Sequence, residues 1–177
     1  GKWEHASDRM IELNGKKIAS NKSTEFEKVI TLPARSGASI EMRMAGLPDE
    51  VASRFEQNGW IIADAFEASR DPSAYQSWIR DSLGEFTVIK SLYAAEPSGW
   101  FSDRSACFLA TGRPVITQSS GFEKWIETGE GLFTFSNLDE AARAVQSVIR
   151  DAEKHARAAR ALAEKHFDAK VVLRELL

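Results

Sequence analysis

The residues best suited to chemistry lie at 99–122, in the segment GWFSDRSACFLATGRPVITQSSGF. The pattern predicts a turn entering a short helix at 102–110, a Gly-x-Pro break, a buried strand and a loop of small residues. Open α/β sheets bind ligands at the carboxyl ends of their strands, and a helix N-terminus there attracts anions. We therefore expect a phosphate site in which main-chain amides converge at the helix entrance, formed by Gly99, Trp100, Phe101, Ser102, Asp103, Arg104 and Ser105.

The side chains of this turn allow two interpretations. Arg104 would donate a charge-assisted hydrogen bond to a phosphate oxygen, and Ser102 and Ser105 would add hydroxyl groups. Alternatively, Ser102 caps its own helix, Asp103 complements the helix dipole, and Arg104 pairs with Asp103 or with solvent. The turn alone does not decide between a ligand site and an ordinary helix start.

Two further groups are expected near the same sheet edge. The loop at 117–122 follows a strand, and its small side chains would admit a ligand close to Gln118, Ser119, Ser120, Gly121 and Phe122. It is otherwise a plain connection in which Ser119 or Ser120 caps a helix that holds Trp125. Glu85 and Lys90 bracket another predicted strand, and Lys90 approaches a phosphate only if it points into the crevice rather than to solvent.

The elements that must position these groups alternate between strand and helix. Apolar runs predict strands at 60–66, 86–93, 114–117 and 132–135, and helical spacing predicts helices at 24–32, 48–58, 102–110, 138–149 and 151–170, with another starting at 71–72. The segment 39–46 fits a strand or a helix equally well. Strands separated by helices imply parallel pairing through right-handed crossovers. We expect one α/β domain at 24–177, a Rossmann-like parallel sheet with helices on both faces, preceded by a linker or peripheral segment at 1–23 with a short strand near 10–13.

Composition narrows the function classes. The chain has 177 residues, 43% of them apolar, and a formal net charge of −3, which argues against nucleic acid or an anionic membrane as partner. No apolar run approaches the roughly 18 residues of a membrane span, and the single cysteine, Cys107, favours a reducing, cytoplasmic location. The chain begins at Gly1, so we expect an excised piece of a longer protein.

Other chemistries fit the sequence poorly. His155 and His166 would lie about 16 Å apart along one helix, too far to share a metal ion. Cys107 has no neighbouring histidine in the sequence and is expected to be a small buried helix residue. The tryptophans at 60, 78, 100 and 125 are expected mostly in the core, with Trp100 bordering a ligand pocket.

Three runs together resemble a known family. They are SLGEFTVIK at 82–90, SGWFSDRSACFLATGRPVITQSSGF at 98–122 and GEGLFTF at 129–135, with HARAARALAEKHFDAKVVLRELL closing the chain. This series resembles the nucleotide-sugar-binding, C-terminal half of GT-B fold glycosyltransferases over about 24–177. The resemblance implies a nucleoside diphosphate sugar as donor substrate, no metal or other cofactor, and an N-terminal acceptor-binding domain of the same polypeptide that supplies the catalytic base.

The resemblance also assigns roles and leaves alternatives. It places the diphosphate at 99–105 and Lys90, and the sugar or nucleotide near Glu85 and the 117–122 loop; Arg104→Ala should then weaken UDP or GDP binding without loss of the fold. Counted back from Gly112, Arg113 and Pro114, the family's ribose-binding acidic position falls on Cys107, which lacks a carboxylate. Nucleotide-sugar epimerases share this scaffold, and a non-catalytic module for nucleotide sensing or protein association is the alternative from another class.

Overall fold

The computed structural model describes residues 2–3, 10–13 and 15–176. It is an α/β structure with three small sheets. The strands are β1 (Met10–Leu13), β2 (Lys16–Ala19), β3 (Ile40–Arg43), β4 (Trp60–Ala63), β5 (Glu85–Thr87), β6 (Val115–Gln118) and β7 (Leu132–Phe135). The helices are α1 (Ser23–Glu27), α2 (Leu32–Ser36), α3 (Asp49–Gln57), α4 (Ala65–Ala68), α5 (Pro72–Asp81), α6 (Ser91–Ala95), α7 (Asp103–Ala110), the 3₁₀ turn η1 (Phe122–Lys124), α8 (Leu138–Arg150), α9 (Ala152–His166) and α10 (Ala169–Leu176).

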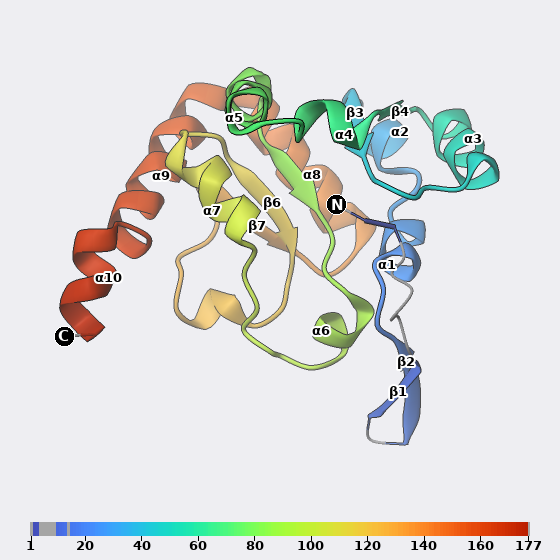
Figure 1. Cartoon of the computed structure of the whole chain (residues 1–177), viewed down its shortest axis with the longest axis horizontal. Helices are drawn as coiled ribbons and strands as arrows, with labels where there is room; N and C mark the ends of the chain where they lie inside the picture. The colour runs from blue at the N-terminus through green and yellow to red at the C-terminus, as the bar shows by residue number, and fades with distance from the viewer. Residues whose placement is uncertain (1, 4–9, 14, 177) are drawn as a thin grey trace.

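The parallel pairing expected from the sequence is confirmed, but the sheet comes in two parts. β5, β6 and β7 pair in that order, all parallel, and β3 pairs in parallel with β4. Within the described ranges, no strand pairing joins β3 to β5. β1 and β2 form an antiparallel hairpin that projects from the body of the molecule (Figure 1).

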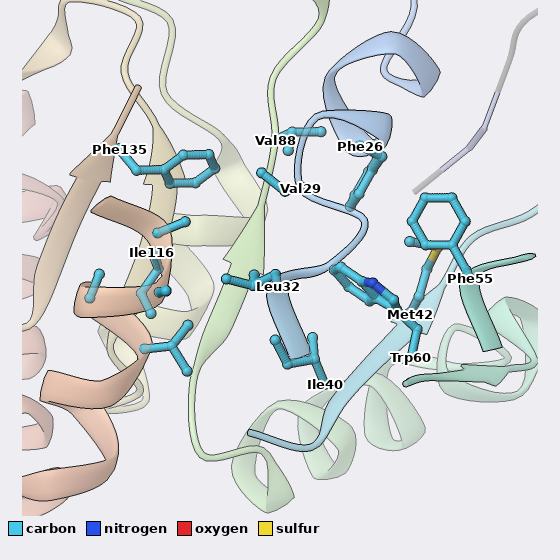
Figure 2. Close-up of a cluster of buried hydrophobic side chains, with 14 of the residues drawn as sticks. Phe26, Val29, Leu32, Ile40, Met42, Phe55, Trp60, Val88, Ile116 and Phe135 are labelled. Atoms are coloured by element: carbon cyan, nitrogen blue, oxygen red, sulfur yellow. The ribbon is translucent and has the colours of Figure 1, made fainter. Parts of the chain in front are cut away.

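Helices cover both faces of the three-stranded sheet. Alternation along β6 sends Ile116 into a core shared with α8, while Val115 faces a second core shared with α5, α7 and α9. The first core continues through the α1–α2 segment to β3 and Trp60, so it bridges the two parallel sheets (Figure 2). Trp3 also lies in this core, 4% exposed, although 1–23 was expected to be peripheral.

Several predicted boundaries were wrong where capping chemistry outweighed the apolar pattern. The helix at 24–32 is two short helices, and Pro33 lies in the first turn of the second, where its missing N–H costs nothing. The strand at 60–66 ends at Ala63, because the Asp64 side chain accepts a hydrogen bond from Phe66 N–H and starts α4. The strand at 86–93 ends at Thr87, and α6 follows from Ser91.

Other elements agree with the sequence or refine it. The ambiguous segment at 39–46 contains the strand β3, and Asn137 caps α8 by accepting from Glu140 N–H at 3.0 Å. The helix expected at 151–170 breaks after His166, where the Asp168 side chain accepts from Lys170 N–H at 2.7 Å. The dipeptide Asn14–Gly15, which is typical of a tight turn, falls partly outside the described residues. No helix in the described part of the chain is long and apolar enough to cross a bilayer.

Candidate anion-binding site

The candidate site is built on the first turn of α7, where two residues reach back to β5. The Arg104 guanidinium pairs with the Glu85 carboxylate through Nε, and its Nη2 donates to Thr87 Oγ1 at 2.9 Å. Ser105 Oγ donates to the other Glu85 oxygen at 2.6 Å. Glu85 is 6% exposed, so α7 is fixed to β5 by a buried, charge-assisted network.

Arg104 is charged and partly open to solvent. Burial would lower its pKa, but the carboxylate of Glu85 more than offsets this, and the pKa lies above its usual value. The side chain retains 24% exposure. The alternative considered above, in which Arg104 pairs with Asp103 or with solvent, is replaced by the pair with Glu85, while Asp103 Oδ1 accepts from the Arg104 main-chain N–H at 2.8 Å.

A second cation stands beside Arg104. Lys22 lies just before α1, and its Nζ is 5.9 Å from the centre of the Trp100 ring. The pKa of Lys22 is lowered to about 8, chiefly by burial and also by the positive charges of Arg104 and Lys90, while Glu85 acts in the opposite direction. Arg104 is paired with Glu85, so the charge of Lys22 beside them leaves an excess of positive charge, which an anion would neutralise.

Sequence reasoning missed Lys22. It lies in the 1–23 segment, which the sequence predicts to be a linker or peripheral, and it is 82 positions from Arg104 in the chain. Nothing in its neighbours, Asn21 and Ser23, marks it as a binding residue. Only the tertiary structure brings it to the start of α7.

Both cations line a cavity of about 850 Å³ between the two parallel sheets. Its walls include Tyr75 and Trp78 from α5, Phe86 from β5 and Met42 from β3. Volumes of 300–1,000 Å³ are typical of small-molecule sites. Of the residues predicted for the site, Glu85 and Arg104 line this cavity; Trp100 lies outside its lining, contrary to the expected pocket border.

The sequence predicts that the main-chain amides of 99–105 converge on a phosphate, but three of them already have acceptors within the protein. Gly99 N–H donates to the Ser120 carbonyl at 2.8 Å, Trp100 N–H to Ser98 Oγ at 3.3 Å, and Arg104 N–H to Asp103. Ser102 precedes α7, but its hydroxyl makes no capping hydrogen bond. Phe101 packs in the second core, edge-on to Phe122. The amides of Gly99, Trp100 and Arg104 are therefore not available to an anion, and the nearby cationic side chains are the groups that could bind one.

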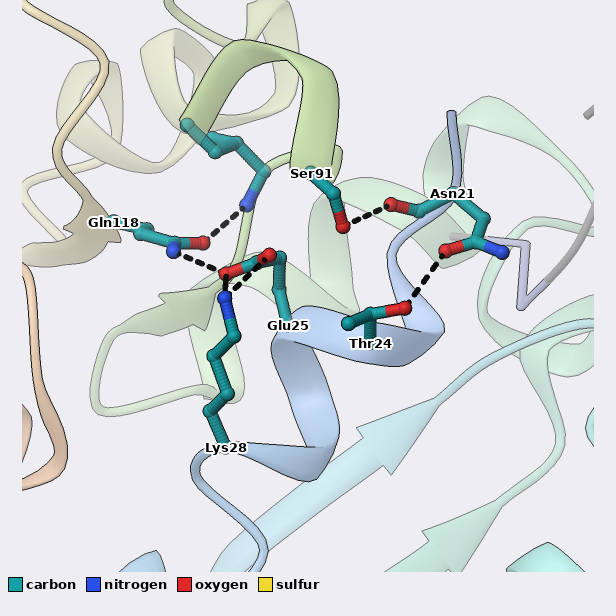
Figure 3. A network of polar contacts seen from close by, with 7 residues as sticks. Asn21, Thr24, Glu25, Lys28, Ser91 and Gln118 are labelled. Carbon is teal, nitrogen blue, oxygen red and sulfur yellow. Dashed lines mark hydrogen bonds and ion pairs between the residues drawn. The ribbon is translucent and has the colours of Figure 1, made fainter. Parts of the chain in front are cut away.

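The 117–122 loop is largely occupied by structural contacts. Gln118 is 9% exposed; its Nε2 donates to Glu25 Oε2 at 2.6 Å, and its Oε1 accepts from Ile89 N–H at 3.3 Å. Lys28 Nζ binds both oxygens of Glu25 at 2.8 Å, which closes the network (Figure 3). The Gln118 amide is thus oriented by α1 and the β5–α6 connection rather than toward a ligand.

The rest of that loop is tied to the start of α7. Ser120 Oγ donates to the Trp100 carbonyl at 2.6 Å, and Gly121 lies so close to Pro97 that an added Cβ would be 2.9 Å from the proline Cβ. Ser119 donates to the Glu123 carboxylate, and Phe122 is buried. Only a 3₁₀ turn precedes Trp125, in place of the helix considered above, and Trp125 is 68% exposed rather than in the core.

The remaining predicted residues take other positions. Lys90 immediately precedes α6, near enough to Lys22 to act on its pKa. Cys107 is exposed, because α7 turns Ser105, Phe108 and Leu109 inward instead. His155 is buried; its Nδ1 accepts from Gly131 N–H at 3.4 Å. No cluster of His, Cys, Asp and Glu suited to a metal ion occurs among the described residues.

Comparisons with protein-family models, with curated proteins and with solved structures give no match to this chain. The functional argument therefore rests on the residues and on the geometry of the site.

Proposed function

We propose that this chain is the nucleotide-sugar-binding domain of a glycosyltransferase of the GT-B fold. The observation that carries the proposal is the pair of cations, Lys22 and Arg104, that line an 850 Å³ cavity, with Arg104 paired to the buried Glu85 carboxylate at the start of α7. The parallel β5–β6–β7 sheet with helices on both faces is consistent with this family. The three motif runs, at 82–90, 98–122 and 129–135, supply the resemblance.

The two cations suit a pyrophosphate. A nucleoside diphosphate sugar carries negative charge on adjacent phosphates, and Lys22 offers a compact ammonium while Arg104 offers a planar guanidinium. The cavity wall formed by Tyr75 and Trp78 would accept a flat nucleobase, since aromatic rings stack with little need for polar partners. The phosphates would then lie at the cavity rim, with the nucleoside inside.

In sugar transfer, the bond between the anomeric carbon and a phosphate oxygen breaks, and its electron pair remains on the diphosphate. The acceptor hydroxyl oxygen forms the new bond to carbon and loses its proton to a base in the partner domain. Lys22 and Arg104 would stabilise the charge that grows on the leaving diphosphate, which is electrostatic catalysis. This chain alone would bind donor without turning it over.

A thermal-shift screen tests the proposal. The chain is heated with UDP, GDP, ADP or TDP, and with inorganic phosphate to distinguish nucleotide recognition from simple anion binding. A ligand at one hundred times its dissociation constant should add about 2.7 kcal/mol to the unfolding free energy. Stabilisation by one nucleotide and not by inorganic phosphate is the expected result. If none of the four nucleotides raises the melting temperature, the proposal fails.

A further inference from the structure

The cavity follows the full length of two strands that belong to different sheets. Every residue of β3 and of β5 lines it, whereas among the described residues β4 contributes only Trp60 and β6 only Ile116. In the part of the chain that the structure describes, β3 pairs with β4 and β5 pairs with β6. The cavity therefore lies along the opposite edges of β3 and β5, and a strand edge can bind a further strand through its main chain.

The two edges run in the same general direction. In Figure 2, β3 rises from Ile40 toward Met42, and β5 rises toward Val88, which follows it in the chain. A strand between them could therefore pair in parallel with both, as β5, β6 and β7 already pair with one another. One continuous sheet would result, in the order β4, β3, inserted strand, β5, β6 and β7.

The walls of the cavity suit a strand that is buried on both faces. Met42 and Ile116 belong to the first core, whereas Tyr75 and Trp78 pack against the second. These two cores lie on opposite faces of the β5–β6–β7 sheet. A strand in the middle of a parallel sheet is covered on both faces in just this way.

The N-terminal segment shows from which direction such a strand enters. Lys2 forms a parallel bridge with Ala45, two residues beyond β3, and Trp3 N–H donates to the Ala45 carbonyl at 3.0 Å. Ala45 lines the cavity, and Trp3 is buried in the first core. Because the bridge is parallel, polypeptide that precedes Lys2 and keeps this pairing runs back along β3, toward its first residue.

The register of this bridge predicts the side chains that the strand needs. If the register continues, the second and fourth residues before Gly1 lie beside Met42 and Ile40, which belong to the first core. Trp3 also faces that core, as the alternation of side chains along one strand requires. We therefore expect large apolar residues at these two positions, and small ones between them, on the face toward α5.

We propose that the space between β3 and β5 holds a parallel β-strand, supplied by polypeptide joined to Gly1, which unites the two parallel sheets. This inference goes beyond the proposed function and does not depend on it. The strand would occupy the space between the sheets. Small side chains on its second face would leave the side of the cavity next to Tyr75 and Arg104 open to a nucleoside diphosphate.

Two extensions of identical composition test the inference: Ile-Thr-Val-Thr and Thr-Ile-Thr-Val, each joined directly to Gly1. The first places its Ile and Val beside Ile40 and Met42, and the second turns them to the other face, because a shift of one residue reverses every side chain. The first extension should raise the melting temperature of the chain by about 5 °C. It should also slow hydrogen exchange of the β3 and β5 main-chain amides about tenfold, and the second extension should do neither.

The outcomes are distinct. Equal melting temperatures and equal exchange rates for the two extensions would overturn the inference, because the register would then have no effect. Slower exchange in β3 alone would overturn it as well, since the added strand would extend one sheet without reaching β5. Repeating the nucleotide screen on the first extended chain keeps the two proposals apart: exchange at β3 and β5 decides the strand, and stabilisation by a nucleotide decides the proposed function.

Discussion

At the scale of single residues, the site depends on how Arg104 is shared. Its guanidinium is the partner of a buried carboxylate, Glu85, and also a donor that faces the cavity. Because Arg104 also neutralises the buried Glu85, replacing it lowers the unfolding free energy. Arg104→Ala is therefore not expected to leave the stability of the fold unchanged, as the sequence alone suggests. Stability and binding must be measured separately.

Arg104→Ala should therefore destabilise the protein as well as weaken nucleotide binding. It leaves the Glu85 carboxylate buried with Ser105 as the one remaining donor among the described residues, which should cost about 2–3 kcal/mol of unfolding free energy. Chemical denaturation measures this cost.

The double variant Glu85→Gln, Arg104→Gln is the control, since it removes both charges and keeps hydrogen-bonding groups. It should recover part of the stability while nucleotide binding stays weak. Unaltered stability in Arg104→Ala would contradict the buried pair, and wild-type nucleotide affinity in the double variant would exclude Arg104 from the site.

At the scale of elements, the close contact between α9 and the start of β7 keeps the sheet and its second core together. Gly131, just before β7, has a φ of +72° and is buried against α9. A Cβ added there would lie 2.3 Å from Ala159 N and 2.8 Å from Ala159 Cα. Those atoms are in the middle of α9 and cannot move without disturbing the helix.

Gly131→Ala should accordingly lower the unfolding free energy by about 2–5 kcal/mol, from the left-handed backbone and the overlap together. Gly129→Ala is a matched control two residues away: its φ is +107°, but no atom lies within 4 Å of the added Cβ, so it should cost only about 1–2 kcal/mol. Urea denaturation of both variants measures the difference. If both variants lose the same unfolding free energy, α9 must shift to accommodate the added Cβ at position 131.

Local sequence predicted those elements whose caps and periodicity agree. β7 and α8 have the expected positions, since Leu132 and Phe135 are buried and Asn137 caps the helix that follows. The prediction failed at 86–93, where an apolar run continues past the strand, because a run of that kind does not distinguish a strand from the helix that follows it.

The candidate site was predictable only in part. Arg104 and Glu85 were identified from the sequence, but their pairing with each other was not, because it spans 19 positions. Gln118 was expected to face a ligand and instead binds Glu25, 93 positions away. The first contact depends on how α7 packs on β5 and the second on how α1 packs on the sheet, and no local pattern in the sequence encodes either.

At the scale of the whole molecule, binding is proposed to occur where the two parallel sheets fail to join. β3 and β5 both border the cavity, and the α1–α2 segment bridges them through the first core. Lys22 stands at the start of that segment and Arg104 on α7, so a bound diphosphate would link two parts of the fold. Anion binding should also change the protonation of Lys22.

The sign of that change follows from the charges. The pKa of Lys22 in the free protein is about 8, lowered from 10.5 by burial and by the neighbouring cations. A bound diphosphate would favour the charged ammonium and raise this pKa, so protons would be taken up on binding near pH 8. The terminal phosphate ionises at a pKa of about 6, well below this window, and contributes little there.

The most direct test is therefore to measure proton uptake on nucleotide binding by calorimetry at pH 8, in two buffers of different ionisation enthalpy, for the wild type and Lys22→Met. The account predicts uptake of up to about half a proton by the wild type. In Lys22→Met, it predicts weaker binding and no such uptake. Binding with no proton exchange, or equal affinity and equal uptake in the variant, would contradict the claim that Lys22 and Arg104 together hold the diphosphate.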